Sequence, residues 1–221
     1  MKNLSNKMKT TALVAGILIS IVSAQAQSEK YTTTMLSLIE KAKTAQTTEN
    51  FQDLANSFAR IAEAEKNEWT AWYYSAFYNL VTSFQDTLVA RKEKYVSLAQ
   101  QQIETGLKLK PEETEFYVLK VMSYYAEMSI DPMKGMTLLG ESNTLISQAK
   151  SINPDNPRIY LEQAEGVYNM PVEFGGGKEK ALPLLLLTKE KFDKFVPADQ
   201  LAPDWGKDRC QMLLSGMDKK N

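Results

Sequence analysis

The sequence predicts an all-α fold, and two patterns carry this prediction. Apolar residues recur at three- and four-residue intervals through most of the chain after residue 26, which is the spacing of one face of an α-helix. The alternation of apolar and polar residues that marks a half-buried strand is sustained nowhere. We predict helices over residues 30–46, 50–65, 68–85, 90–108, 113–129, 134–152, 156–170, 177–194 and 204–217.

The first 26 residues predict a cleavable signal peptide. Three lysines (Lys2, Lys7 and Lys9) form a basic start, residues 12–22 are an apolar run, and small residues stand at 24–26. The run is too short to span a bilayer, and no cysteine near the cleavage site offers a lipid anchor. The alternative is a buried N-terminal helix. We expect a mature chain without a stable membrane anchor, in a Gram-negative periplasm or secreted.

Composition excludes several classes of function. Removing the three lysines of the signal peptide leaves 23 basic against 27 acidic residues, a net charge of 23 − 27 = −4, and the charges are scattered. This argues against a nucleic-acid surface. The single Cys210 has no partner for an internal disulfide. Because the chain has no histidine, histidine-dependent nucleophiles and zinc sites are impossible. We predict no catalytic residue, no metal site and no cofactor.

The run of three glycines before Lys178, in "MPVEFGGGKEKALPLL", does not predict a phosphate-binding loop. That loop requires a second, earlier glycine and a hydroxyl residue after the lysine, but Val172 and Glu179 occupy these positions. The segment before it has helical rather than strand spacing. We predict a tight turn between two helices, with a small anion-binding nest of backbone amides as the alternative.

Three segments align on a common repeat, anchored at Lys66, Pro111 and Pro154. The residues 12, 8 and 5 positions before each anchor are Leu54, Phe58 and Ile61; Ala99, Ile103 and Gly106; and Ser142, Ile146 and Ala149. The residues six positions after each anchor are aromatic: Trp72, Tyr117 and Tyr160. Four positions further on stand Ala76, Val121 and Ala164, two of them small enough for helices to approach closely. Leu38, Ala42 and Ala45 begin an earlier unit, and Ala181 and Leu185 continue the last one.

This pattern resembles the tetratricopeptide repeat over residues 30–195. It departs from that repeat at Val121, where a small residue is expected, and its units are 45 and 43 residues apart instead of 34. The resemblance implies a right-handed superhelix of about four helix hairpins, with residues 27–196 as the repeat domain and 197–221 as a C-terminal capping segment. The stretch "NPRIYLEQAEGVYNMPVEFGGGKEKALPLL" with "PDWGK" resembles exported bacterial tetratricopeptide-like proteins, which implies binding or assembly rather than catalysis.

The residues that lengthen these units lie between the two helices of each hairpin. They surround "SFQDTLVARK", "SIDPMKGM" and "PVEFGGG". Insertions at equivalent points of stacked repeats emerge on one edge, often a functional edge. The alternative is that they only lengthen the helices.

The first helices of three successive units predict a binding wall that is poor in charge. We expect its partner-binding residues to be Tyr73, Phe77, Met122, Tyr125 and Tyr168. An apolar groove needs an occupant, which could be a peptide, a lipid-like molecule, a partner protein or the chain's own tail. The tail offers the apolar residues Trp205, Met212, Leu213 and Met217, and we favour a terminal cap over the last repeat as its role.

The sequence therefore favours an exported, non-catalytic tetratricopeptide-like adaptor that binds a protein or peptide through its concave face. A first alternative is a periplasmic accessory protein that binds a small apolar ligand. A second is a carboxylate-dependent hydrolase of cell-envelope polymers, for which Glu162 and Glu165, three positions apart on one helix face, are the candidate acid–base pair. The alternative without catalysis is that these two glutamates belong to a solvated helix face. The sequence assigns no oligomeric state.

Overall fold

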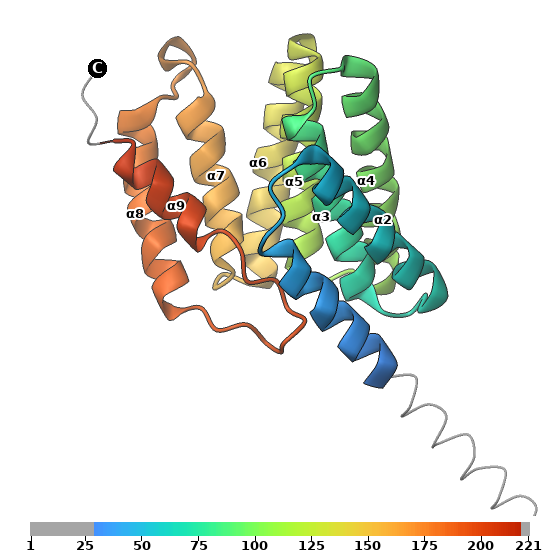
Figure 1. Ribbon diagram of the computed structural model, residues 1–221. Helices are drawn as coiled ribbons and strands as arrows, with labels where there is room; N and C mark the ends of the chain where they lie inside the picture. The colour runs from blue at the N-terminus through green and yellow to red at the C-terminus, as the bar shows by residue number, and fades with distance from the viewer. Residues whose placement is uncertain (1–28, 218–221) are drawn as a thin grey trace, which may run out of the picture.

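The computed structural model describes residues 29–217, and within this range all regular structure is helical (Figure 1). A first helix covers residues 29–42. It is followed by α2 (Thr48–Ala64), α3 (Trp69–Gln85), α4 (Val89–Leu109), α5 (Thr114–Ile130), η1 (Pro132–Lys134), α6 (Gly135–Ile152), α7 (Pro157–Asn169), η2 (Val172–Phe174), α8 (Lys178–Lys194) and α9 (Lys207–Ser215). The all-α prediction is confirmed for this range, while the predicted signal peptide lies outside the described residues.

Consecutive helices run antiparallel and stand side by side, which fits a helical-repeat-like fold (Figure 1). Local sequence sets where they begin. Thr47 and Asn50 form a reciprocal capping box at the start of α2, and the Asn156 side chain caps α7, whose first residue is Pro157. The hydrophobic core divides into three clusters: one over the helices up to α5, one between α5, α6 and α7, and one among α7, α8 and α9.

One hydrogen bond recurs in three successive units and supports the predicted repeat register. The indole N–H of Trp72 donates to the carbonyl of Lys66 at 3.4 Å. The Tyr117 hydroxyl donates to the carbonyl of Pro111 at 3.1 Å, and the Tyr160 hydroxyl to that of Pro154 at 2.9 Å. In each case the aromatic side chain of the first helix of a unit donates to the backbone carbonyl six positions earlier, in the turn before that helix. The aromatic side chains are thus half-buried, with their polar ends at the turns.

The small residues of the repeat lie where helices approach closely. Ala76 and Ala164 are fully buried, and Val121, the departure from the pattern, is buried as well. At Gly106 in α4 a Cβ atom would lie 1.9 Å from the Phe116 ring of α5, so only glycine allows this contact. Size complementarity therefore holds neighbouring helices together.

The C-terminal helix is shorter than predicted. The spacing predicted a helix from residue 204, but α9 begins at Lys207 because Gly206 takes a left-handed conformation with φ of 107°. A Cβ atom there would lie 2.6 Å from the Phe192 ring. Cys210 and Leu213 of α9 are buried against α7 and α8, whereas Met212 is exposed and Trp205 precedes the helix.

Candidate binding site

The chain's own C-terminal segment packs on α3. Residues 195–206, which we call the strap, leave α8, pass beside the first helix and α3, and return to α9 (Figure 1). The Tyr74 hydroxyl lies 3.1 Å from the carbonyl oxygen of Leu201 and 3.4 Å from that of Ala202, and it donates to them. The strap thus lies on the α3 part of the predicted wall, while Tyr168 in its α7 part packs with α9, so the chain's own tail, one of the expected occupants, contacts both parts.

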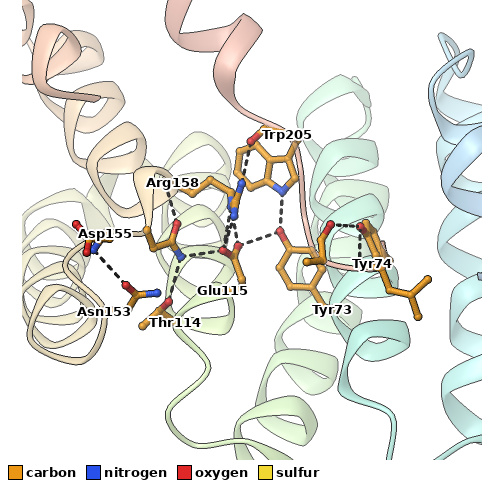
Figure 2. Close-up of polar contacts among 11 residues, drawn as sticks. Tyr73, Tyr74, Thr114, Glu115, Asn153, Asp155, Arg158 and Trp205 are labelled. Carbon is orange, nitrogen blue, oxygen red and sulfur yellow. Dashed lines mark hydrogen bonds and ion pairs between the residues drawn. The ribbon is translucent and has the colours of Figure 1, made fainter. Parts of the chain in front are cut away.

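Trp205 is the side chain by which the strap meets α3 (Figure 2). Its indole ring stacks on Phe77, with ring centroids 4.9 Å apart. Its N–H donates to the Tyr73 hydroxyl at 2.6 Å, and that hydroxyl donates in turn to Glu115 of α5 at 3.3 Å. Burial, together with the Glu115 charge, raises the pKa of Tyr73 well above its usual value. The phenol therefore stays protonated and links the strap to α5.

A buried ion pair lies beneath Trp205 (Figure 2). Arg158, in the first turn of α7, places Nη2 2.8 Å from Oε1 of Glu115, and its Nε lies 2.9 Å from both carboxylate oxygens. The Asn156 amide also donates to Glu115, at 2.8 Å. Arg158 Nη1 donates to the Trp205 carbonyl at 3.2 Å, and its guanidinium lies over the Phe195 ring. One arginine thus joins α5, α7 and both ends of the strap.

Sequence reasoning missed this pair, although a signal was present. Glu115, in the first turn of α5, suits the helix dipole by itself and so gives no sign of a partner. Arg158, however, places a positive charge in the first turn of a helix, where the dipole disfavours it. A positive charge at this end of a helix indicates a carboxylate partner elsewhere in the fold. Only the tertiary structure identifies that partner as Glu115.

The five predicted partner-binding residues have different surroundings. Tyr73 is completely buried, and its ring stacks on half-buried Phe77. Met122 packs between two of the core clusters. The Tyr125 hydroxyl donates to the carbonyl of residue 162 at 3.1 Å, and Tyr168 packs in the cluster of α7, α8 and α9. The structure thus brings Tyr73 and Phe77 together under Trp205, and it leaves the other three as half-buried wall of α5 and α7.

The candidate acid–base pair does not share an accessible cleft. Glu162 is buried beside a small apolar space between α5, α6 and α7, and burial with the nearby Glu165 charge raises its pKa well above the usual value. Glu165 is instead held in an ion pair by Arg209 of α9, with Nη2 2.9 Å from Oε2. One carboxyl is enclosed and the other is neutralised, so this geometry gives no support to acid–base chemistry.

The glycine run forms the predicted tight turn. Gly175 and Gly177 take positive φ values of 87° and 98°. The amides of all three glycines already donate to backbone carbonyls of Val172, Pro171 and Val167. An anion would find none of them free, so the alternative of an anion-binding nest is wrong.

Exposed apolar side chains gather on the three connections inside the hairpins: α3–α4, α5–α6 and α7–α8. These connections lie at the same end of the molecule, the upper end in Figure 1. We call the following residues the apolar end: Phe84, Leu88, Val89, Met133, Met136, Val172 and Phe174. Met133 is 92% exposed, Met136 82% and Phe174 69%, so most of their apolar surface faces solvent. The predicted insertions emerge at one end and carry apolar surface, and the first of them also lengthens its helices, since only residues 86–88 separate α3 from α4.

Other kinds of site find little support within residues 29–217. A shallow hollow of 660 Å³ between the α4–α5 and α6–α7 turns has mixed walls, with Leu109 and Ile152 beside Lys110, Glu112 and Glu113. This part of the chain holds no group of three or more histidine, cysteine, aspartate or glutamate side chains placed to bind a metal ion. None of its helices is long and apolar enough to cross a membrane.

Comparison with known proteins gives one informative likeness. The chain matches no protein-family model and no curated protein. It is similar to the solved structure of the HusA haemophore from Porphyromonas gingivalis, with 28% sequence identity and a TM-score of 0.76. The match covers 85% of this chain and 92% of the haemophore chain, so it extends over nearly the whole helix array.

Proposed function

We propose that this chain is an exported binding protein for a flat, mainly apolar ligand of the haem class, and that the apolar end holds this ligand. The observation that carries the proposal is the set of seven large apolar side chains exposed on three connections at one end. Exposed large apolar side chains that gather in one region often mark a binding site. Each Å² of it that a ligand covers contributes about 25 cal/mol.

The chemistry of these side chains suits a porphyrin. Phe84 and Phe174 offer ring faces for stacking, and the unbranched side chains of Met133 and Met136 adapt to a flat surface. A thioether is also an established axial ligand of haem iron. Since the chain has no histidine, these two methionines are the candidates for such a bond at the apolar end.

Basic residues beside the apolar end suit the carboxylates of a haem. Lys134 lies between Met133 and Met136, and Arg91 lies two positions after Val89. Their side chains are 52% and 56% exposed, and they are paired with Glu127 and Asp86. The Lys134–Glu127 pair is partly exposed and exchanges partners at little cost, so Lys134 is able to meet a propionate, whereas Arg91 is held by the buried carboxylate of Asp86.

The likeness to a haemophore supports the same ligand class. The recurring aromatic-to-carbonyl hydrogen bonds support the finer fold assignment, a right-handed superhelix of about four tetratricopeptide-like hairpins over residues 27–196 with a capping segment at 197–221. Export, with cleavage after Ala26, is part of the proposal.

A protein or peptide adaptor remains the second candidate. One observation favours it: the inner face accepts an extended chain segment, since the strap lies there now. A partner would have to displace the strap to reach the predicted wall, whose residues are Tyr73, Phe77, Met122, Tyr125 and Tyr168.

The test is a titration of the mature chain with haemin, followed by Soret absorbance, with two matched leucine variants. Leu88 at the apolar end is 56% exposed, and Leu186 on the outer face of α8 is 54% exposed. We expect Leu88→Ala and the pair Met133→Ala/Met136→Ala to weaken haemin binding about fivefold or more, because buried apolar area is lost. Leu186→Ala should bind like the wild type. Absence of haemin binding, or an equal loss in Leu186→Ala, would contradict the proposal.

A further inference from the structure

We propose that the strap is a releasable clasp and that Trp205 is the positioning residue that sets how α7 and α8 stand relative to α3 and α5. Closure of the clasp is then coupled to ligand binding at the apolar end. The coupling rests on the proposed function, whereas the clasp itself does not.

The division of the core explains why a clasp is needed. The cluster among α7, α8 and α9 is separate from the cluster that holds the helices up to α5. Trp205 packs against the α7–α9 cluster and against the small cluster between them, and it stacks on Phe77 of the first. Leu201 of the strap packs on the first cluster too. The strap therefore touches all three.

The strap is attached to α3 by few contacts, so it is able to detach without unfolding of the helices. The attachment consists of the ring stack, the Trp205–Tyr73 hydrogen bond and the bonds from Tyr74 to two strap carbonyls. The strap has no regular secondary structure, and its first half is mostly exposed, with Val196 at 80%, while Pro203 and Gly206 in its second half are buried. Segments with few buried contacts open at a lower free energy than the whole fold. Pro197 and Gly206 bound the part that would move.

The same two helices carry the clasp and the apolar end. The strap binds α3 through Tyr73 and Tyr74, and Phe84 stands near the far end of that helix. It binds α7 through Arg158 in the first turn, while Val172 follows the last turn. Thirteen helical residues span about 20 Å, so a small tilt of α7 at the clasp shifts the α7–α8 connection relative to its neighbours. A ligand that bridges these connections must in turn favour one position of α7.

The clasp is tested without any ligand by amide hydrogen exchange. The variants are Trp205→Ala and the milder Tyr74→Phe, which removes only the bonds to the strap carbonyls. The control is Leu54→Ala, which removes a buried side chain of α2 that takes part in none of the hydrogen bonds or ring contacts of the strap. We expect both clasp variants to speed exchange in residues 157–194 at least fivefold while α2 and α4 keep their protection. In Leu54→Ala the effect should instead be strongest around α2. Uniform acceleration over all helices in the clasp variants would overturn the clasp.

The coupling is tested with haemin in two directions. Saturating haemin should slow exchange at the strap amides of the wild type, and Tyr74→Phe should bind haemin several-fold more weakly than Leu54→Ala, because linkage is reciprocal. If haemin binds but neither change occurs, the coupling is refuted. If haemin does not bind at all, the proposed function and the coupling fail, while the exchange experiment still decides whether the strap is a clasp.

Discussion

The indole N–H of Trp205 donates a hydrogen bond to the Tyr73 hydroxyl at 2.6 Å, across 132 positions of the chain. This contact helps to hold the strap over Tyr73 and Phe77 of α3. It also connects the strap to the buried Arg158–Glu115 pair, since the Tyr73 hydroxyl donates onward to Glu115. The strap and the ion pair therefore form one polar network, and its members should respond together to substitution.

Tyr73→Phe should lower the free energy of unfolding by about 1–3 kcal/mol, because it leaves the Trp205 N–H without its acceptor in a buried site. Tyr117→Phe is the matched control, since its hydroxyl bonds a carbonyl at an exposed turn. Urea unfolding measures both. Equal losses in the two variants would show that the Tyr73 hydroxyl has no special role.

Replacing one member of the Arg158–Glu115 pair should be worse than replacing both. Arg158→Met alone leaves the Glu115 carboxylate buried without its cation, which typically costs about 3–5 kcal/mol. The double variant Arg158→Met/Glu115→Gln removes both charges and should recover part of that loss. A double-mutant cycle on unfolding free energies measures the coupling, and additive losses would refute it.

Ala164→Leu should destabilise the chain by about 1–3 kcal/mol, because the larger side chain overpacks the contact of α7 with its neighbours. Ala76→Leu in α3 should behave alike. Ala90→Leu, at an exposed alanine of α4, is the control. Thermal unfolding of all three variants checks the repeat register, and unchanged stability at Ala76 and Ala164 would show that the register is wrong.

Glu162→Gln should change how stability depends on pH. Burial, then the Glu165 charge, raises the pKa of Glu162 in the folded chain, so the folded state retains this proton better than the unfolded state. The stability that it contributes is complete below the unfolded pKa of about 4.3 and is lost as pH rises towards the folded pKa. The variant should match the wild type near pH 4 and exceed it near pH 8. Glu104→Gln, at an exposed site, should show no such difference.

Export predicts the N-terminus of the native protein. Mass spectrometry of protein from its own cell envelope should find a chain that begins at Gln27 or its cyclised form, because the small residues at 24–26 mark the cleavage site. An intact chain that begins with Met1 in the cytoplasm would contradict export.

Several features of this protein follow from sequence alone. Helix positions were predicted to within four residues, because each helix buries one face and the spacing of its apolar residues records that face. The turn at residues 175–177 was predicted because positive φ angles need glycine. The sequence predicted that Trp72, Tyr117 and Tyr160 occupy equivalent positions in successive repeat units, because close packing requires large and small side chains at regular intervals.

The tertiary structure alone decided which surfaces are free. Tyr73 and Phe77 have the composition of a binding wall, yet the strap covers them, and their own spacing carries no information about a segment more than 100 positions away. Glu162 and Arg158 look like surface charges in the sequence, but helix stacking buries both. Met133 and Phe174 lie in the predicted insertions, but only the structure shows that their side chains stay exposed there. Periodicity determines which face of a helix is apolar, whereas the path of the whole chain determines what covers that face.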